Sequence, residues 1–137
     1  MTHSEGTVET GRLSVTLVDD NRTYRSALRT MISDYPQIGT VREAANADEL
    51  FDMLGDSPPD VVIMDVSMPG MDGFEATERL YYQHPHIKVI ILTIYNTEEY
   101  QTKAKQCGAV AFVAKQDAVE GLEVALKAIF HQNNATS

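Results

Sequence analysis

Short apolar runs alternate with longer amphipathic stretches along most of this chain. Five runs predict β-strands, at residues 13–18, 40–44, 61–64, 89–92 and 110–114. Most of them are rich in Val, Ile and Leu without strict alternation, which is typical of strands buried on both faces of a sheet. The second run is more polar and predicts an edge strand.

The stretches between and after these runs have helical periodicity. The apolar or capping positions are Tyr24, Leu28, Met31 and Ile32 in the first predicted helix, Asn46, Glu49, Leu50, Phe51 and Leu54 in the second, and Phe74, Thr77, Leu80 and Tyr81 in the third. The fourth predicted helix covers residues 97–106 and ends at Gly108. The fifth begins at Asp117 and has Val119, Leu122, Leu126, Ile129 and Phe130 on one face. Asn46 and Glu49 have the spacing of a capping box.

The resulting order is strand then helix, five times. It predicts a doubly wound α/β fold, (βα)5, with a parallel five-stranded sheet, right-handed crossovers and helices on both faces. We expect residues 1–12 to form a flexible N-terminal tail, 13–131 a single domain, and 132–137 a C-terminal tail or the start of a linker.

Composition excludes several classes of protein. The 137 residues suit one domain, and the net charge of −9 argues against a nucleic-acid-binding surface, which needs clustered Lys and Arg. The single cysteine allows no internal disulfide. We see no signal peptide and no apolar run long enough to span a bilayer, so we expect a cytoplasmic protein without membrane contact.

Carboxylates recur where predicted strands end. Asp19 and Asp20 follow the first run, Asp65 follows the third, and Thr93 and Lys115 follow the fourth and fifth. In a parallel sheet these ends share one edge, where ligands bind. Three carboxylates in one crevice repel each other and stay ionised only beside a cation, and their hard oxygen ligands favour Mg²⁺.

Four motifs carry a family resemblance, at residues 18–21, 64–73, 91–93 and 107–115. In this order, each at a strand end, they resemble the receiver domain of two-component response regulators, the CheY-like superfamily, from about Leu13 to Phe130. The Lys115-Gln116-Asp117 ending is similar to receivers that precede a LuxR-type DNA-binding domain.

The resemblance implies a role for each site residue. Asp65 would be the phosphoacceptor, and Mg²⁺ would be held by Asp19, Asp20, Asp65 and the backbone carbonyl of Ser67. A carboxylate can attack phosphorus as a covalent nucleophile, provided that cations screen the two negative groups. Phosphoryl transfer asks mainly for positioning and charge neutralisation, so no separate strong base is needed.

The same resemblance implies a switch. Thr93 would hydrogen-bond the phosphoryl group, Lys115 would pair with it, and Phe112 would rotate into the space that Thr93 vacates. The implied phosphodonor is a sensor histidine kinase or a phosphotransfer protein. The chain would catalyse only its own phosphorylation and dephosphorylation, and would relay the signal to a DNA-binding output domain absent from this chain.

Three positions depart from the family pattern. Gln116 follows Lys115 where many members have proline, so we expect a trans peptide there. Phe112 stands where tyrosine is frequent, and it lacks the hydroxyl. Tyr95 is bulky, and we hypothesise that it restricts the hydrolytic water and lengthens the phosphorylated lifetime.

Two other functions compete with this reading, and the oligomeric state is open. A Mg²⁺-dependent aspartyl-phosphate phosphatase or phosphotransferase would use Asp65 as its nucleophile, but the dehalogenase-like members need a second aspartate where this chain has Ser67. A flavodoxin-like cofactor binder would need a glycine-rich phosphate loop, which we do not find. Val124, Ala118 and Ala125, away from the main stripe of the last helix, predict a phosphorylation-dependent homodimer.

Overall fold

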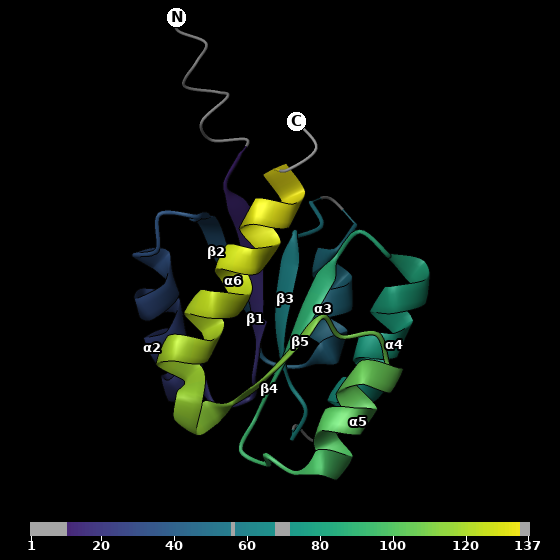
Figure 1. Cartoon of the computed structure of the whole chain (residues 1–137). Coiled ribbons are helices and arrows are strands. Elements are labelled where there is room, and N and C mark those ends of the chain that lie inside the picture. Colours follow the sequence, from purple (N-terminus) through teal and green to yellow (C-terminus); the bar gives the residue numbers. More distant parts are fainter. Residues whose placement is uncertain (1–10, 56, 68–71, 135–137) are drawn as a thin grey trace, which may run out of the picture.

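Five parallel strands form a single sheet in the order β2-β1-β3-β4-β5 (Figure 1). The structure, a computed structural model, describes residues 11–55, 57–67 and 72–134. The strands are β1 (Leu13–Val18), β2 (Ile38–Ala44), β3 (Val61–Asp65), β4 (Lys88–Thr93) and β5 (Ala111–Ala114). The predicted (βα)5 fold is confirmed, and the polar second run is an edge strand, as expected.

Helices cover both faces of the sheet. They are α2 (Arg22–Ser33), α3 (Ala47–Met53), α4 (Gly73–Gln83), α5 (Glu98–Gln106) and α6 (Ala118–Asn134), and a 3-10 turn spans Lys115–Asp117. Figure 1 shows α2 and α6 on one face, and α3, α4 and α5 on the other. The chain therefore has the two helical layers of a doubly wound fold.

Each face has its own apolar cluster. Ile32 and Leu122 pack with the inward residues of β1 on the side of α2 and α6, while Leu50 and Leu80 pack with Met64 on the other side. The side chains of all five are fully buried. Because the strands are apolar on both faces, the sheet separates the two clusters.

The helices begin at polar caps. Asn21, Asn46, Asp72 and Thr97 each accept a hydrogen bond from a backbone N–H in the first turn of α2, α3, α4 and α5. Such caps satisfy donors that have no partner within the helix. Glu49 accepts from the N–H of Ala45, one residue before the cap, so the expected capping box is displaced by one position.

Two residues of the predicted apolar helix faces lie outside the core. Val119 is 64% exposed, because residues 115–117 form a 3-10 turn and α6 begins only at Ala118, which is buried in its place. Tyr81 is 53% exposed, because Leu80 takes the core position and Tyr81 lies at the edge of the apolar stripe.

Gly108 lies in the turn after α5, where both the backbone conformation and the surrounding space require glycine. Its φ of +95° is a conformation that other L-residues rarely adopt, and a Cβ at this position would overlap the ring of Tyr81. Tyr81 thus packs on a backbone turn instead of the core.

Several predicted segments lie outside the described residues: 1–10 and 135–137 of the expected tails, and 68–71 of the second motif. Helix α6 continues to Asn134, three residues past the expected domain boundary at 131. None of the described helices combines the length and the apolar character needed to cross a bilayer.

Candidate functional site

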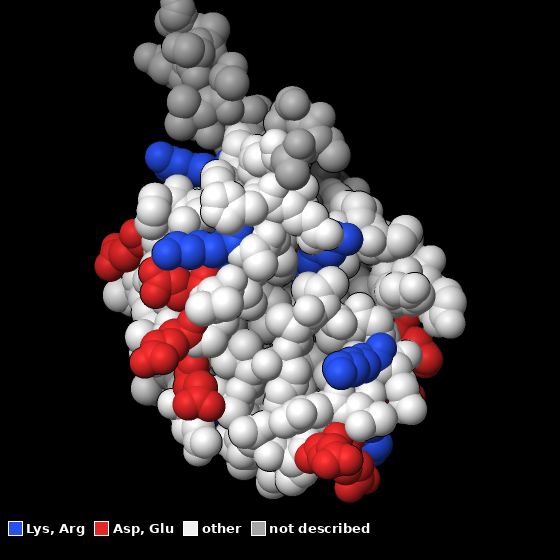
Figure 2. Space-filling model, in the orientation of Figure 1, with Lys and Arg blue, Asp and Glu red and all other residues white. Residues whose placement is uncertain are grey.

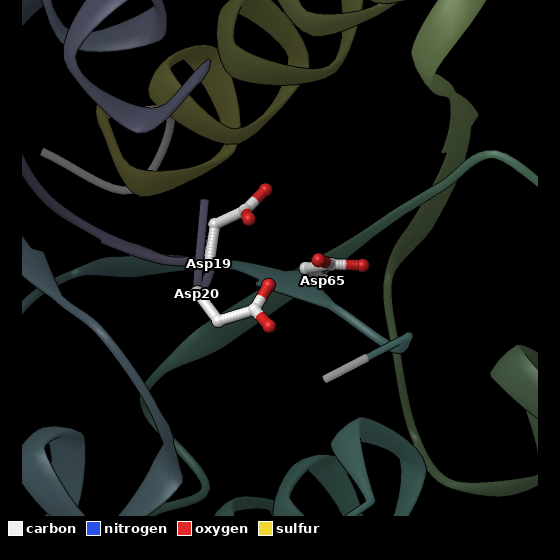
Figure 3. A group of neighbouring side chains, drawn as sticks. All are labelled: Asp19, Asp20 and Asp65. Atoms are coloured by element: carbon white, nitrogen blue, oxygen red, sulfur yellow. The ribbon is translucent and has the colours of Figure 1, made fainter. Parts of the chain in front are cut away.

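Three carboxylates meet where β1 and β3 end. Val18 pairs with Met64 in the parallel register, so Asp19 and Asp20 leave β1 beside Asp65. Figure 3 shows the three side chains gathered around one space. One oxygen of each lies within 4.8 Å of the others. The strand register thus brings together the three acids selected from the sequence.

Asp19 is held on both of its carboxylate oxygens. Its side chain is buried, Oδ1 accepts the N–H of Asn21 at 2.8 Å, and Oδ2 accepts Lys115 Nζ at 3.1 Å. Burial raises the pKa of Asp19, the N–H of Asn21 opposes that rise, and the charge of Asp65 adds to it. A positive charge at this edge is therefore favourable for both acids.

Lys115 supplies one such charge. It follows β5 directly, and its Nζ lies 3.1 Å from Asp19 Oδ2 and 3.6 Å from Asp65 Oδ2. Burial opposes its charge, but the hydrogen bond to Asp19 and the negative charges of Asp65 and Asp19 outweigh burial and raise the pKa of Lys115. The Lys115–Gln116 peptide is trans. Lys115 is thus a fixed cation between two buried carboxylates.

The two oxygens of Asp65 have different surroundings. Oδ1 accepts the N–H of Ser67 at 2.9 Å and its hydroxyl at 2.6 Å, whereas Oδ2 faces Lys115. The predicted role of Ser67 involves only its carbonyl, whereas in the structure its hydroxyl also contacts the site. An aspartate followed two residues later by a serine, as in Asp65 and Ser67, is a sequence pattern typical of a turn in which the second residue donates to the carboxylate. This pattern could have predicted the contact.

Thr93 and Phe112 stand on the neighbouring strands. Thr93 is fully buried at the end of β4, and its hydroxyl accepts the N–H of Tyr95 at 3.1 Å. Within the described part of the chain, no hydrogen bond joins Thr93 to Asp65. Phe112 is half-buried and lines an open pocket of about 360 Å³ between α5 and β5.

The acidic cluster fits a small hard cation. Oxygens on opposite sides of a Mg²⁺ ion lie about 4.2 Å apart, since each ligand distance is about 2.1 Å. Three oxygens cannot all lie opposite one another, and adjacent ligands are about 3.0 Å apart, so a spread of up to 4.8 Å must contract by an inward movement of the carboxylates to bind one ion. Asp20 is exposed and its side chain has room to make it. The donor set, all oxygen, suits Mg²⁺ better than a softer metal.

Two further residues, Arg25 and Tyr24, contact the site, and Glu43 orients one of them. Arg25 donates to the backbone carbonyl of Asp19 and to Glu43, and the centroid of the Tyr24 ring lies 4.4 Å from Lys115 Nζ. The hydroxyl of Tyr24 is buried without a hydrogen-bond partner among residues 11–55, 57–67 and 72–134. Nothing in local periodicity marks these contacts, because they join helix α2 to separate strands.

The face that carries α6 and α5 has scattered charges. In Figure 2 the basic side chains on this face stand apart from one another, while acidic ones gather along the left side of the view and near the start of α5, whose first turn holds Glu98 and Glu99. A nucleic-acid interface needs clustered Lys and Arg. The described residues of this face present no such cluster.

Comparison with known proteins gives the family. Residues 15–127 match the sequence family described as response regulator receiver domain. Response regulator GacA of Pseudomonas aeruginosa is 31% identical over 118 residues, which cover 86% of this chain and 55% of that protein. The chain thus spans about half the length of the curated relatives it matches.

Solved structures agree with this match. A LuxR-family two-component response regulator from Aurantimonas sp. SI85-9A1 superposes with a TM-score of 0.82 at 30% identity, over 88% of this chain and 86% of that one. Chemotaxis protein CheY4 of Vibrio cholerae superposes with a TM-score of 0.75 at 27% identity, over 86% and 98%. The chain belongs to the receiver domain family of two-component response regulators.

Proposed function

We propose that this receiver domain accepts a phosphoryl group on Asp65, in a Mg²⁺-dependent reaction, from a sensor histidine kinase or a phosphotransfer protein. The observation that carries the proposal is the placement of Asp65 within reach of two other carboxylates and 3.6 Å from the Lys115 ammonium. A single aspartate at a strand end would not support it.

The chemistry needs charge neutralisation more than proton transfer. A carboxylate oxygen of Asp65 attacks phosphorus, the bond from phosphorus to the donor histidine nitrogen breaks, and that nitrogen keeps the electron pair. Mg²⁺, when held by Asp19, Asp20, Asp65 and the backbone carbonyl of Ser67, would screen the repulsion between the carboxylate and the incoming phosphoryl oxygens.

The residues of the chain itself prepare this attack. Lys115 already faces Asp65 Oδ2, where it can pair with the developing phosphoryl charge. Ser67 fixes Asp65 through Oδ1, so the carboxylate keeps one orientation. Both contacts exist before any phosphodonor binds, and preorganisation of this kind lowers the cost of reaching the transition state.

The conformational response would pass through Thr93 and Phe112. The Thr93 hydroxyl accepts from the N–H of Tyr95 and still has its own proton to donate to a phosphoryl oxygen. Phe112 is half-buried beside a pocket of about 360 Å³, so its ring has space to change position. A local charge event would then alter the surface formed by α5, β5 and α6.

The output would lie in another part of the protein. We propose a cytoplasmic signalling module that relays its state to a DNA-binding domain, and that is not a turnover enzyme.

A phosphorylation-dependent homodimer remains a prediction with less support than the sequence suggested: Val124 is 69% exposed, but Ala118 is buried and Ala125 is half-buried against the core. The boundaries of the domain at 13 and 131 also remain a proposal.

Intact-mass measurement tests the proposed function. The chain is incubated with a small-molecule phosphodonor, with and without Mg²⁺, beside Asp65→Asn. We expect a gain of one phosphoryl group in the native chain, with Mg²⁺ only, and none in Asp65→Asn. Repeated turnover of the phosphodonor without a phosphorylated chain would favour the phosphatase alternative.

A further inference from the structure

Arg25 connects the acidic site to the edge strand. Its Nη1 donates to the backbone carbonyl of Asp19 at 2.5 Å, and its Nε donates to Glu43 Oε1 at 2.8 Å. We propose that Arg25 is a positioning residue for the cation site: oriented by Glu43, it fixes the Asp19–Asp20 peptide and so sets the backbone position from which the Asp20 side chain would reach the cation. This inference rests on the proposed function, because it concerns the same Mg²⁺ site.

The guanidinium of Arg25 is built into the fold. Its side chain is 12% exposed, between α2 and β2, and that of Glu43 is 20% exposed. Arginine presents its N–H groups in a rigid plane, so a bond from Nε to Glu43 also sets the direction of Nη1. The carbonyl of Asp19 lies in that direction. Asp19 follows Val18, which is the last residue of β1 that pairs with β3.

The consequence falls on Asp20. Asp19 is held at every polar atom: its N–H donates to the carbonyl of Ala44 at 3.2 Å, and its carboxylate is held by Asn21 and Lys115. The Asp20 side chain, by contrast, is exposed and has no hydrogen-bond or ion-pair partner in the described part of the chain. Its position depends on the backbone, and the planar peptide that Arg25 holds is the one that leads into Asp20.

Two simpler roles make different predictions. If Arg25 only pinned α2 to β2, its loss would lower stability and leave cation affinity unchanged. If Arg25 acted only as a charge, its removal would strengthen Mg²⁺ binding, because one positive charge near the cation would be gone. Only the positioning role predicts weaker Mg²⁺ binding, so the direction of the change in Mg²⁺ affinity separates the three roles.

Arg29 provides a matched control. Its Nη1 pairs with the other oxygen of Glu43 at 3.0 Å, and its side chain is 51% exposed. Among the described residues it makes no contact with Asp19. Arg25→Met and Arg29→Met thus each remove one positive charge that pairs with Glu43. Only Arg25→Met also removes the hydrogen bond to the carbonyl of Asp19.

The experiment is calorimetric titration of each protein with MgCl₂. We expect Arg25→Met to bind Mg²⁺ about tenfold or more weakly than the native chain, the loss seen when outer partners of metal ligands are removed. Arg29→Met should keep native affinity. Arg25→Lys should remain weak, because an ammonium retains the charge and cannot hold Glu43 and Asp19 in one plane.

Folding is measured separately. Far-UV circular dichroism establishes that each variant is folded, and the amide NMR shifts of residues 19–21 without Mg²⁺ should move in Arg25→Met and Arg25→Lys but not in Arg29→Met. Equal affinities for Arg25→Met and Arg29→Met, or tighter binding by Arg25→Met, would overturn the inference and leave the proposed function standing. Absence of Mg²⁺ binding by the native chain would remove both.

Discussion

At the residue scale, the positive charge of Lys115 neutralises part of the charge of two buried carboxylates. The stability of the unphosphorylated protein without Mg²⁺ therefore depends on this lysine. Removing one partner of such a group leaves uncompensated charge in the interior, which costs about 3 kcal/mol. We therefore expect Lys115→Met to lose about 2–3 kcal/mol of unfolding free energy at neutral pH, since the lysine is itself partly exposed. Urea denaturation without Mg²⁺ measures this loss.

Lys127 is the control for that prediction. It pairs with Glu123 at 3.7 Å on the surface of α6, and its side chain is 51% exposed. Lys127→Met should change stability by less than about 0.5 kcal/mol. Similar losses in the two variants would mean that Lys115 is an ordinary surface lysine.

Glu43 gives the stability of the fold a pH dependence. Hydrogen bonds from Arg29 and Arg25 hold the pKa of Glu43 below its ordinary value of 4.5. A carboxylate with a lowered pKa stabilises the fold above its unfolded pKa, and this contribution is lost as pH falls through the folded pKa. The stability difference between native protein and Glu43→Gln should thus be full above about pH 5 and shrink below pH 4.5. Denaturation at several pH values measures it, and a constant difference would contradict the pairing.

Tyr95 is the residue that we expect to control the phosphorylated lifetime. Its N–H is tied to the Thr93 hydroxyl, and its ring lies against Tyr100, with centroids 5.2 Å apart. If that ring restricts water at Asp65, Tyr95→Ala should dephosphorylate several-fold faster. Tyr82→Ala, which removes a 74% exposed tyrosine from α4, is the control. Decay at the native rate in Tyr95→Ala would eliminate the idea.

At the scale of elements, α4 approaches β3 through a glycine. A Cβ at Gly73 would lie 2.6 Å from the carbonyl oxygen of Asp65 and 2.7 Å from Cα of Val66, both backbone atoms. Gly73→Ala should therefore displace the connection after Asp65 and cost about 1–3 kcal/mol, in the range of an overpacked core. Urea denaturation gives the cost.

Gly55→Ala is the matched substitution, because a Cβ there meets nothing within 4 Å among the residues that the structure describes. It should leave stability and phosphorylation near native values. If Gly73→Ala behaved like Gly55→Ala, the close approach of α4 to Asp65 would have no energetic weight.

The elements also show what the sequence can predict. The buried strands β1 and β3 appear as apolar runs, which only Ser14 and Thr16 interrupt, so β1 has the predicted bounds and β3 extends the prediction by one residue. The predicted apolar face of α6 is wrong at the start of the helix. A 3-10 turn at Lys115–Asp117 has no periodicity that the sequence could reveal, and after it Ala118 is buried where Val119 was expected. Errors of this kind occur where one element passes into the next.

At the scale of the whole molecule, parallel strands collect distant residues at one edge. Asp19, Asp65 and Lys115 were predictable as neighbours, because each stands at the carboxyl end of a strand and the parallel topology places those ends at one edge of the sheet. The Arg25–Glu43 pair was not predictable in the same way, since it depends on how α2 packs over β2. The sequence thus predicts the charges of the site, and tertiary packing determines what holds them.

The central claim is that this edge makes Asp65 reactive toward phosphorus. It is tested most directly by treating the chain with a phosphodonor and Mg²⁺, reducing the acyl phosphate with borohydride, and mapping the modified peptide by mass spectrometry. Reduction converts a phosphorylated aspartate to homoserine. We predict homoserine at position 65 alone, and only when Mg²⁺ was present. Homoserine at another aspartate, or at position 65 equally without Mg²⁺, would contradict the account.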